Sequence, residues 1–323
     1  MKICILGAGS YALALALTFY KNNNSVTVWT KLEEEKDEIL KTRQNKKALP
    51  NVYLPEEIKI TTDLECSNSA DMIVFAVPIA FFRSTCIKLK NYLKIDPYFM
   101  IATKGIENDT GLFCHQILTS IIDTEKVCIL SGPTFAIDLA KNNLCGLTLA
   151  SSFDTNKKIL NSIQSNYLMI DETNDIIGTE ICGSIKNVIA IASGMLDGMG
   201  YPISTSTMFI TESLHDIKAL IKALGGNKKT ILSFAGFGDI LLTCTSTKSR
   251  NYTLGKLIGE GKSKEEINNY IKNTTIEGLY TLYSIKKLLR NKKIKMPIIN
   301  LIYDIIVNEK EPSNLTKFLI EKE

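Results

Sequence analysis

Residues 2–30 read KICILGAGSYALALALTFYKNNNSVTVWT, and this stretch decides the fold of the first half of the chain. We expect a buried strand over Lys2–Leu6 that leads directly into a glycine turn at residues 7–12. An apolar helix then follows to Tyr20, and a second strand covers Val26–Thr30. A G-x-G-x-x-(G/A) turn between a strand and a helix, closed by a further strand, predicts a dinucleotide-binding unit.

The three small residues of this turn have different physical tasks. Gly7 permits the tight turn after the strand, and Gly9 lets the backbone approach a pyrophosphate. Ala12 occupies the third position, where a small side chain still permits close packing of the helix on the strand. The N-terminus of the helix offers free N–H groups to the phosphates. The alternative is a glycine turn in an α/β protein that binds no nucleotide.

The end of the second strand bears on the choice of cofactor. It reads Trp29-Thr30-Lys31, and no carboxylate follows before Glu33. A carboxylate at this point binds the ribose 2′-hydroxyl of NAD, whereas a basic side chain suits the 2′-phosphate of NADP. Lys31 therefore favours NADP or the use of both cofactors. Alternatively, Lys31 only begins the next, highly charged helix.

The alternation of strands and helices continues beyond this unit. Apolar runs predict strands over 72–77, 99–102 and 127–130. Such alternation is typical of a doubly wound, Rossmann-like α/β domain with a parallel sheet and helices on both faces. The loops at 103–107 and 131–136 leave strand ends, where ligands of such sheets gather. Taken alone, each of these loops is more often an ordinary turn.

After Asp171 the pattern becomes helical, and we divide the chain into residues 1–172 and an all-helical domain over 173–323. A stop at Gly225-Gly226 ends one helix, and Ser263 with Glu266 forms the capping box of another. Helices are expected over 175–199, 206–224, 263–272, 278–290 and 298–307.

The first of these helices contains one Lys-Asn pair, Lys186-Asn187, in an otherwise apolar run of small residues from Gly178 to Gly200. A helix that is apolar all round belongs in a core. Burial disfavours the charged form of a lysine, so Lys186 is a candidate proton donor or acceptor. The alternative is a lysine whose stem lies along apolar surface while its head reaches water.

Residues 235–251, AGFGDILLTCTSTKSRN, form a second polar group. Asp239 opens a short apolar helix, and Thr243 lies one turn later on the same face. Ser249-Arg250-Asn251 then offers a hydroxyl, a guanidinium and an amide, which suit a phosphate. The alternatives are a helix cap for Asp239 and a solvated surface charge for Arg250.

Composition excludes several classes. A formal charge of +4, spread along 323 residues, gives no basic surface for nucleic acid. The eight cysteines form no C-x-x-C, and with only two histidines the spacing of a zinc site is absent. We expect no metal and read the cysteines as free thiols of a reducing cytoplasm. The first residues show no signal-peptide pattern, and no uninterrupted apolar stretch reaches the ~18 residues of a membrane span.

Seven segments, in order along nearly the whole chain, carry a family resemblance. The chain resembles the bacterial-type NAD(P)-dependent glycerol-3-phosphate dehydrogenases. The segments are GAGSYALALA at 7–16, ATKGIE at 102–107, LSGPTFA at 130–136, Lys186-Asn187, GFGDILLTCTSTKSRN at 236–251, IEGL at 276–279 and MPI at 296–298.

The resemblance implies a homodimeric enzyme that reduces dihydroxyacetone phosphate to sn-glycerol 3-phosphate with NAD or NADP and feeds phospholipid synthesis. It implies that Lys186 transfers the proton, with Asp239, Asn187 and Lys104 as its polar companions. The implied substrate-binding residues are Lys104, Gly132, Thr134, Thr243, Ser249, Arg250 and Asn251. The implied cofactor-binding residues are Gly7, Gly9, Ser10, Tyr11, Ala12, Lys31, Lys104, Ala136, Arg250 and Glu277.

The chain departs from the family pattern at several positions. Tyr11-Ala12 replaces the common Trp-Gly, and Ala48 stands where a tyrosine is usual. Pro202-Ile203-Ser204 replaces a typical Gly-Asp-Asn, and Glu212 replaces an arginine. These last changes bear on one wall of the substrate site, on regulation or on subunit contacts, while the proposed chemical groups are intact.

Two alternatives stay open. The chain could be another two-domain reductase, acting on a hydroxyacyl, ketopantoate or phosphogluconate substrate. It could also be a dinucleotide-binding sensor that kept the cofactor platform and lost catalysis.

Overall fold

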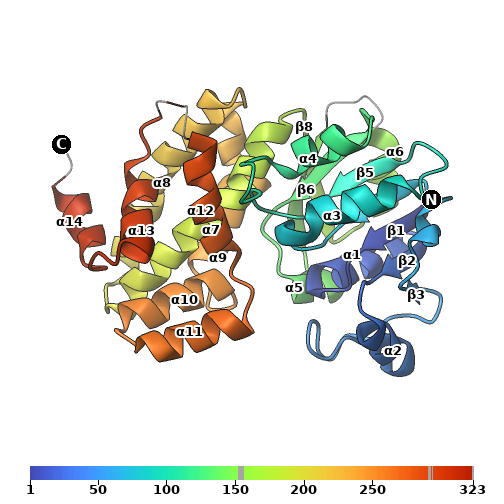
Figure 1. Ribbon diagram of the computed structural model, residues 1–323, viewed down its shortest axis with the longest axis horizontal. Coiled ribbons are helices and arrows are strands. Elements are labelled where there is room, and N and C mark those ends of the chain that lie inside the picture. The colour runs from blue at the N-terminus through green and yellow to red at the C-terminus, as the bar shows by residue number, and fades with distance from the viewer. Residues whose placement is uncertain (152–155, 290–291, 293, 322–323) are drawn as a thin grey trace. The chain divides into compact units, whose positions relative to one another are not determined.

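The computed structural model describes residues 1–151, 156–289, 292 and 294–321. It forms two compact units, one of residues 1–103 with 114–176 and one of residues 104–113 with 177–323 (Figure 1). This division differs from the predicted one at 172/173 mainly in the segment 104–113. That segment belongs to the second unit because Ile106 and Phe113 are buried in its helical core.

The first unit is built on one sheet of eight strands in the order β3-β2-β1-β4-β5-β6-β7-β8. Neighbouring strands are parallel except β6 and β7, which are antiparallel. The strands are β1 (Lys2–Leu6), β2 (Ser25–Trp29), β3 (Lys59–Thr61), β4 (Met72–Phe75), β5 (Tyr98–Ile101), β6 (Val127–Ser131), β7 (Cys145–Ser151) and β8 (Leu168–Thr173). The Rossmann-like fold is thereby confirmed.

Helices connect these strands. They are α1 (Ser10–Lys21), α2 (Glu33–Thr42), α3 (Ile79–Lys90), α4 (Cys114–Ile121), α5 (Ala136–Ala140) and α6 (Asn156–Ile163), with a 3₁₀ turn η1 (Leu64–Ser67). The crossover through α1 runs from β1 toward one edge, and that through α3 runs from β4 toward the other. Because such crossovers are right-handed, the two helices cover opposite faces of the sheet. Accordingly α1 packs with α5 and α6, whereas α3 packs with α4.

Three strands were not predicted from the sequence. β3 is only three residues long, β7 follows the five-residue helix α5, and β8 follows β7 through α6. β7 lies antiparallel to β6, so these two strands do not form the βαβ unit on which the prediction was based. Alternation thus identifies the parallel centre of the sheet and misses its edges.

The glycine turn has the geometry that its sequence predicts. Gly7 has φ of +119°, and a Cβ there would lie 2.7 Å from the carbonyl oxygen of Ala76. Its N–H donates to the carbonyl of Trp29 at 2.8 Å. Only glycine fits a backbone that passes this close to the end of β4 with a positive φ.

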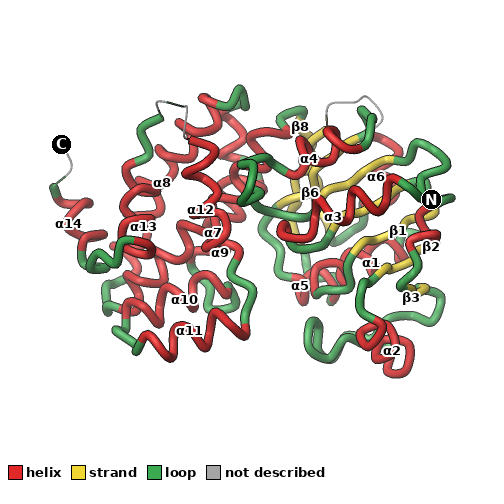
Figure 2. Tube along the Cα trace, in the orientation of Figure 1, coloured by secondary structure: helices red, strands yellow, loops and turns green. Residues whose placement is uncertain are grey.

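The second unit is helical (Figure 2). Among its described residues, β-type pairing is confined to an isolated bridge between Ile106 and Phe113. The helices are α7 (Ile176–Gly198), α8 (Ile203–Ala223), α9 (Asp239–Cys244), α10 (Arg250–Gly259), α11 (Lys264–Asn273), α12 (Glu277–Leu289), α13 (Pro297–Val307) and α14 (Asn314–Ile320), with the short turns η2 (Lys228–Leu232) and η3 (Phe234–Gly238).

The five predicted helices correspond to α7, α8, α11, α12 and α13. The predicted end of α12 at Arg290 lies outside the described residues. The capping box is confirmed, because Ser263 Oγ accepts from the N–H of Glu266 and the Glu266 carboxylate accepts from the N–H of Ser263. Gly225, with φ of +86°, follows the end of α8 as predicted.

Helix α7 requires one correction. The sequence suggested that no apolar stretch could span a membrane, yet by length and composition alone the 23 residues of α7 could do so. In the structure, 94% of its most apolar window is buried inside the protein. It is therefore the central core helix of the second unit.

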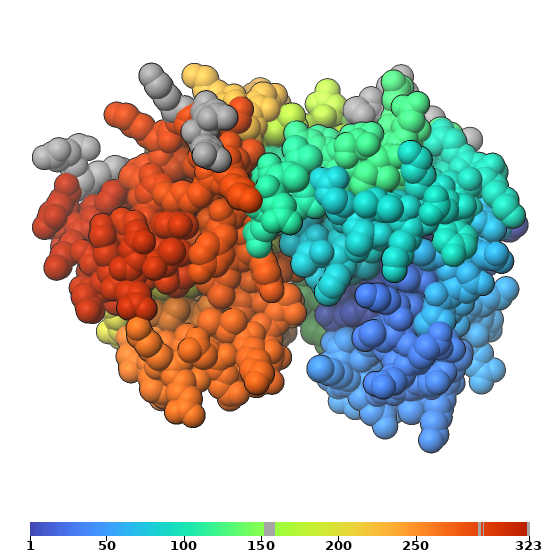
Figure 3. Space-filling model, in the orientation of Figure 1, coloured from blue at the N-terminus to red at the C-terminus, as the bar shows by residue number. Residues whose placement is uncertain are grey.

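Four glycines bring α7 and α10 into backbone contact. A Cβ at Gly194 would lie 2.0 Å from the carbonyl oxygen of Tyr252, and one at Gly255 would lie 1.8 Å from that of Ile191. Gly198 and Gly259 are equally tight, one turn further along each helix. α10 also packs against α11, and both lie at the surface in orange (Figure 3). The glycines thus fix α10, whose first residues are Arg250 and Asn251, against the helix that contains Lys186.

We predict that Gly255→Ala destabilises the protein by at least about 2 kcal/mol, because the added methyl overlaps a backbone carbonyl that cannot move freely. The urea midpoint measured by circular dichroism tests this. Leu257→Ala, at a partly exposed position of the same helix, is the matched control and should cost less. Equal midpoints for Gly255→Ala and the unmodified protein would contradict the packing argument.

Candidate active site

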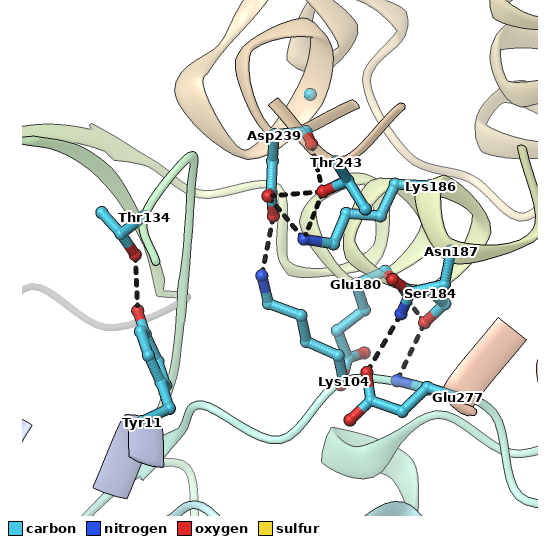
Figure 4. A network of polar contacts seen from close by, with 12 residues as sticks. Tyr11, Lys104, Thr134, Glu180, Ser184, Lys186, Asn187, Asp239, Thr243 and Glu277 are labelled. Carbon is cyan, nitrogen blue, oxygen red and sulfur yellow. Dashed lines mark hydrogen bonds and ion pairs between the residues drawn. The ribbon is translucent and has the colours of Figure 1, made fainter. Parts of the chain in front are cut away.

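A buried cluster of charges lies at the centre of the second unit (Figure 4). Asp239 accepts from two lysines, with Lys186 Nζ 2.5 Å from its Oδ1 and Lys104 Nζ 2.7 Å from its Oδ2. Lys186 Nζ also donates to Thr243 Oγ1 at 3.1 Å. The side chain of Asp239 is 2% exposed, that of Lys186 10% and that of Lys104 18%. One carboxylate therefore balances two ammonium groups that have little access to water.

Local backbone geometry positions Asp239. The π-helical turn η3 directly precedes it, and Gly236 within that turn has non-helical angles of φ −85° and ψ −111°. A Cβ on Gly236 would lie 2.4 Å from the carbonyl oxygens of Thr230 and Ile231. Thr243, four residues after Asp239, donates to its main-chain carbonyl at 2.6 Å and accepts from Lys186. The predicted shared face of Asp239 and Thr243 is thus present.

The electrostatics of the cluster favour proton transfer at Lys186. Burial lowers the pKa of Lys186 to about 8, with Lys104 lowering it further and Asp239 opposing the shift. Burial would raise the pKa of Asp239, but the two lysines outweigh this and hold the pKa below its usual value. A lysine with a pKa near physiological pH exists in both protonation states, as an acid–base group requires. Lys186 is only 8% exposed, and its Nζ contacts Asp239 and Thr243.

A second polar network begins at the neighbouring residue. Asn187 Nδ2 donates to Glu277 Oε2 at 3.0 Å, and Asn187 Oδ1 accepts from Asn251 Nδ2 at 3.1 Å. Asn251 Oδ1 in turn accepts from the N–H of Gly278 at 2.8 Å. Gly278 must be glycine, because a Cβ there would lie 2.6 Å from the carbonyl oxygen of Asn187. This network links α7, α10 and α12.

The sequence placed Ser249, Arg250 and Asn251 together as a phosphate-binding trio. The structure separates their roles. Ser249 caps α10, its Oγ accepting from the N–H of Tyr252 at 3.3 Å, and Arg250 is exposed as the first residue of that helix. Asn251 is buried, and its amide bonds to Asn187 and Gly278. Arg250 is therefore exposed and Ser249 is buried as the helix cap, whereas Asn251 positions Asn187.

The residues expected to bind a dinucleotide lie at the carboxyl end of β1 in the first unit. A Cβ on Gly9 would meet nothing within 4 Å, and the N-terminus of α1 has no side-chain cap. Ser10 is the first residue of this 12-residue helix, and Ala12 is buried beneath it. Open space beside uncapped helical N–H groups fits a pyrophosphate. We conclude that these residues suit a dinucleotide.

The loop after β6 lies next to this turn. Thr134 Oγ1 is 3.4 Å from the hydroxyl of Tyr11, as Figure 4 shows. A Cβ on Gly132 would lie 2.7 Å from the carbonyl oxygen of Gly146, so this loop passes close over β7. Ala136 begins α5 directly afterwards. Two segments that are far apart in the sequence thus meet beside the glycine turn.

Three polar residues near these sites were not singled out from the sequence. Asn45 Nδ2 donates both to the carbonyl of Ala8 in the glycine turn, at 3.1 Å, and to Glu35, at 2.9 Å. Ser184 Oγ accepts from the N–H of Gly105, next to Lys104, at 3.2 Å. No spacing signal in the sequence marks them, because each acts on a residue from another segment.

Two of the atypical segments, Pro202-Ile203-Ser204 and Glu212, lie at α8. Pro202 is the N-cap residue of this helix, Ile203 is 68% exposed and Glu212 is partly buried. Lys31, the predicted NADP contact, is exposed just beyond β2.

Comparison with known proteins decides the family. Residues 2–158 match the family model of the NAD-dependent glycerol-3-phosphate dehydrogenase N-terminus, and residues 175–317 match that of the C-terminus. The chain belongs to this dehydrogenase family. The resemblance inferred from the seven segments is thus confirmed.

Individual members of the family match this chain along nearly their whole length. The chain is 33% identical to the glycerol-3-phosphate dehydrogenase [NAD(P)+] of Neisseria gonorrhoeae, over all of this chain and 98% of the relative. It is 32% identical to that of Staphylococcus haemolyticus with the same coverage. A crystal structure of glycerol-3-phosphate dehydrogenase from Coxiella burnetii superposes with a TM-score of 0.94 at 30% identity, covering 99% of both chains.

The charge cluster makes a prediction about the pKa of Lys186. Lys104→Met removes a like charge and should raise this pKa above its value of about 8, whereas Asp239→Asn removes the stabilising anion and should lower it. NMR titration of ¹³C-labelled lysine, with Lys186→Met to identify the signal, measures both shifts. Titration of Lys186 near 10.5, unaffected by either change, would show that the cluster does not control it.

Proposed function

We propose that this chain catalyses the NAD(P)-dependent interconversion of dihydroxyacetone phosphate and sn-glycerol 3-phosphate. The observation that carries the proposal is the buried Lys186–Asp239–Lys104 cluster, in a chain that belongs to the glycerol-3-phosphate dehydrogenase family. In the reductive direction a ketone carbon gains a hydride and its oxygen gains a proton. The product supplies glycerophospholipid synthesis.

Lys186 is the proton-transfer residue of this proposal. When bound, the reduced nicotinamide supplies the hydride. Lys186 donates a proton from Nζ to the oxygen that becomes anionic as the ketone is reduced. In the reverse direction the neutral amine accepts the proton from the alcohol. Its pKa of about 8 makes both protonation states accessible.

The neighbours of Lys186 orient it and set its charge. Asp239 and Thr243 each hold Nζ, so the ammonium has a defined direction within the core. Lys104, on the other oxygen of Asp239, brings a second positive charge that stabilises an anionic oxygen or phosphate. Glu277 and Asn251 hold the amide group of Asn187, the residue that follows Lys186 in the chain.

The exposed guanidinium of Arg250 and the hydroxyl of Ser249 are the proposed phosphate-binding groups. A planar guanidinium binds phosphate oxygens through two hydrogen bonds, which fixes orientation as well as affinity. Binding at this remote group holds the carbonyl in place for reaction. Gly132 and Thr134 are the further proposed substrate contacts.

The cofactor is NAD or NADP, and residues of the glycine turn are the proposed contacts. Gly7, Gly9 and the uncapped N-terminus of α1 would hold the pyrophosphate. Further proposed contacts are Ser10, Tyr11, Ala12, Lys31, Lys104, Ala136, Arg250 and Glu277.

Two further assignments belong to this proposal. We place the enzyme in the cytoplasm, since all eight cysteines are free thiols, as a reducing compartment requires. We also propose a homodimer, which sedimentation analysis tests directly. Among the competing substrates, the outward-facing Arg250 favours a phosphorylated ketone over ketopantoate or a hydroxyacyl group. Relative rates with these substrates and with a phosphogluconate discriminate between them.

We predict that Lys186→Met folds and binds cofactor but loses at least about 10²-fold in turnover, the low end for loss of a general acid. Steady-state reduction of dihydroxyacetone phosphate with NADH and with NADPH measures this. Lys222→Met, at an exposed position on α8, is the control and should retain full turnover. Near-normal turnover of Lys186→Met would refute its role. Cofactor binding by the unmodified protein without any turnover would favour the sensor alternative.

We predict that Arg250→Ala raises the KM for dihydroxyacetone phosphate at least about tenfold, because it removes a charged partner of the phosphate. Arg250→Lys should give an intermediate KM, since it keeps the charge but not the bidentate geometry. Saturation curves at fixed cofactor concentration provide the measurement. An unchanged KM in Arg250→Ala would exclude this residue from the phosphate site.

A further inference from the structure

A carboxylate does lie at the end of β2, although the sequence shows none there. It belongs to Glu35, in the first turn of α2. Thr30, the first residue after β2, donates its hydroxyl to Glu35 Oε2, and Asn45 Nδ2 donates to Glu35 Oε1 at 2.9 Å. The turn between β2 and α2 therefore brings the carboxylate back to the strand end.

The same contacts place Glu35 beside the glycine turn. Asn45 Nδ2 also donates to the carbonyl of Ala8, so the side chain of Asn45 bridges the Glu35 carboxylate and the glycine turn. Asn45 is 3% exposed, and its Oδ1 accepts from the N–H of Ala48 at 2.9 Å. Glu35 is thus held by a buried, fully engaged amide rather than by a mobile surface contact.

Glu35 differs from the two glutamates that precede it. Glu33 forms an ion pair with Lys36 and accepts from Thr62, and Glu34 is exposed. Glu35 is half-buried, and among the described residues no lysine or arginine forms an ion pair with it. Each of its oxygens accepts one hydrogen bond and retains a lone pair for another. Its negative charge is therefore available to a ligand at the strand end.

We propose that Glu35 reads the 2′ position of the adenosine ribose and makes the chain selective for NAD(H) over NADP(H). This rests on the proposed function, because it assumes that the glycine turn binds the cofactor. In this fold the ribose 2′-hydroxyl lies at the end of the second strand, where it donates a hydrogen bond to a carboxylate. The same charge repels a 2′-phosphate, so it acts against the wrong cofactor as well as for the right one. Lys31, the residue after Thr30, is exposed.

A purely structural role for Glu35 makes a different prediction. An acidic side chain in the first turn of α2 stabilises that helix through its dipole. Its loss would then weaken the binding of both cofactors alike, through a less ordered turn. A role in recognition instead changes the ratio of the two affinities, because only one cofactor carries the 2′-phosphate.

The experiment measures the dissociation constants of NADH and NADPH by cofactor fluorescence, without substrate, for the full chain and its variants. We expect the unmodified protein to bind NADH more tightly. Glu35→Gln keeps the size of the side chain and removes its charge. It should lower the ratio of the NADPH to the NADH dissociation constant at least about tenfold. Glu34→Gln, one residue earlier and exposed, is the matched control and should leave the ratio unchanged.

Several results would overturn the assignment of Glu35. These are tighter binding of NADPH by the unmodified protein, an unchanged ratio in Glu35→Gln, or an equal change in Glu34→Gln. Failure to bind either dinucleotide would reject both this assignment and the cofactor site. A shifted ratio in a protein that does not reduce dihydroxyacetone phosphate would support Glu35 and contradict only the proposed reaction.

Discussion

The second unit depends on one buried electrostatic balance, in which the carboxylate of Asp239 accepts from the ammonium groups of Lys186 and Lys104. Removing one partner of such a buried pair leaves an uncompensated charge, which costs about 3–5 kcal/mol. Burial, with a smaller contribution from Lys104, lowers the pKa of Lys186 to about 8, whereas Asp239 opposes this shift. The same three side chains thus affect both the stability of the unit and the pKa of Lys186.

The surrounding helices are arranged to keep these groups in place. The glycine contacts between α7 and α10 bring two backbones together, and Asn251 then reaches Asn187 from the N-terminal turn of α10. Gly236 provides the non-helical step of η3 that precedes Asp239. At each of these glycines, the absence of a side chain allows two backbone segments to come into contact. These glycine positions near Lys186 therefore tolerate little added volume, because the surrounding backbone atoms have few ways to move.

In the first unit, backbone groups rather than charged side chains form a surface that suits an anion. Gly9 leaves open space beside the uncapped N-terminus of α1, while Thr30 and Asn45 hold one carboxylate at the end of β2. Polar backbone groups and a single placed charge suit a ligand with negative phosphates and a neutral ribose. In the role proposed for Glu35, its carboxylate discriminates against a cofactor with a 2′-phosphate by charge repulsion, which needs no additional contacts.

The sequence by itself determined the dinucleotide-binding turn, the parallel centre of the sheet, five helices and the apolar helix with its single lysine. These follow from local periodicity and glycine spacing, which depend on near neighbours in the chain. Only the tertiary structure decided that 104–113 joins the helical unit, that Asn251 supports Asn187, and that Glu35 supplies the carboxylate missing after β2. Each is a contact between segments that are separate in sequence, or a turn that reverses the chain. The local sequence pattern cannot predict these contacts, because many segments have similar local patterns and only the packed structure shows which of them meet.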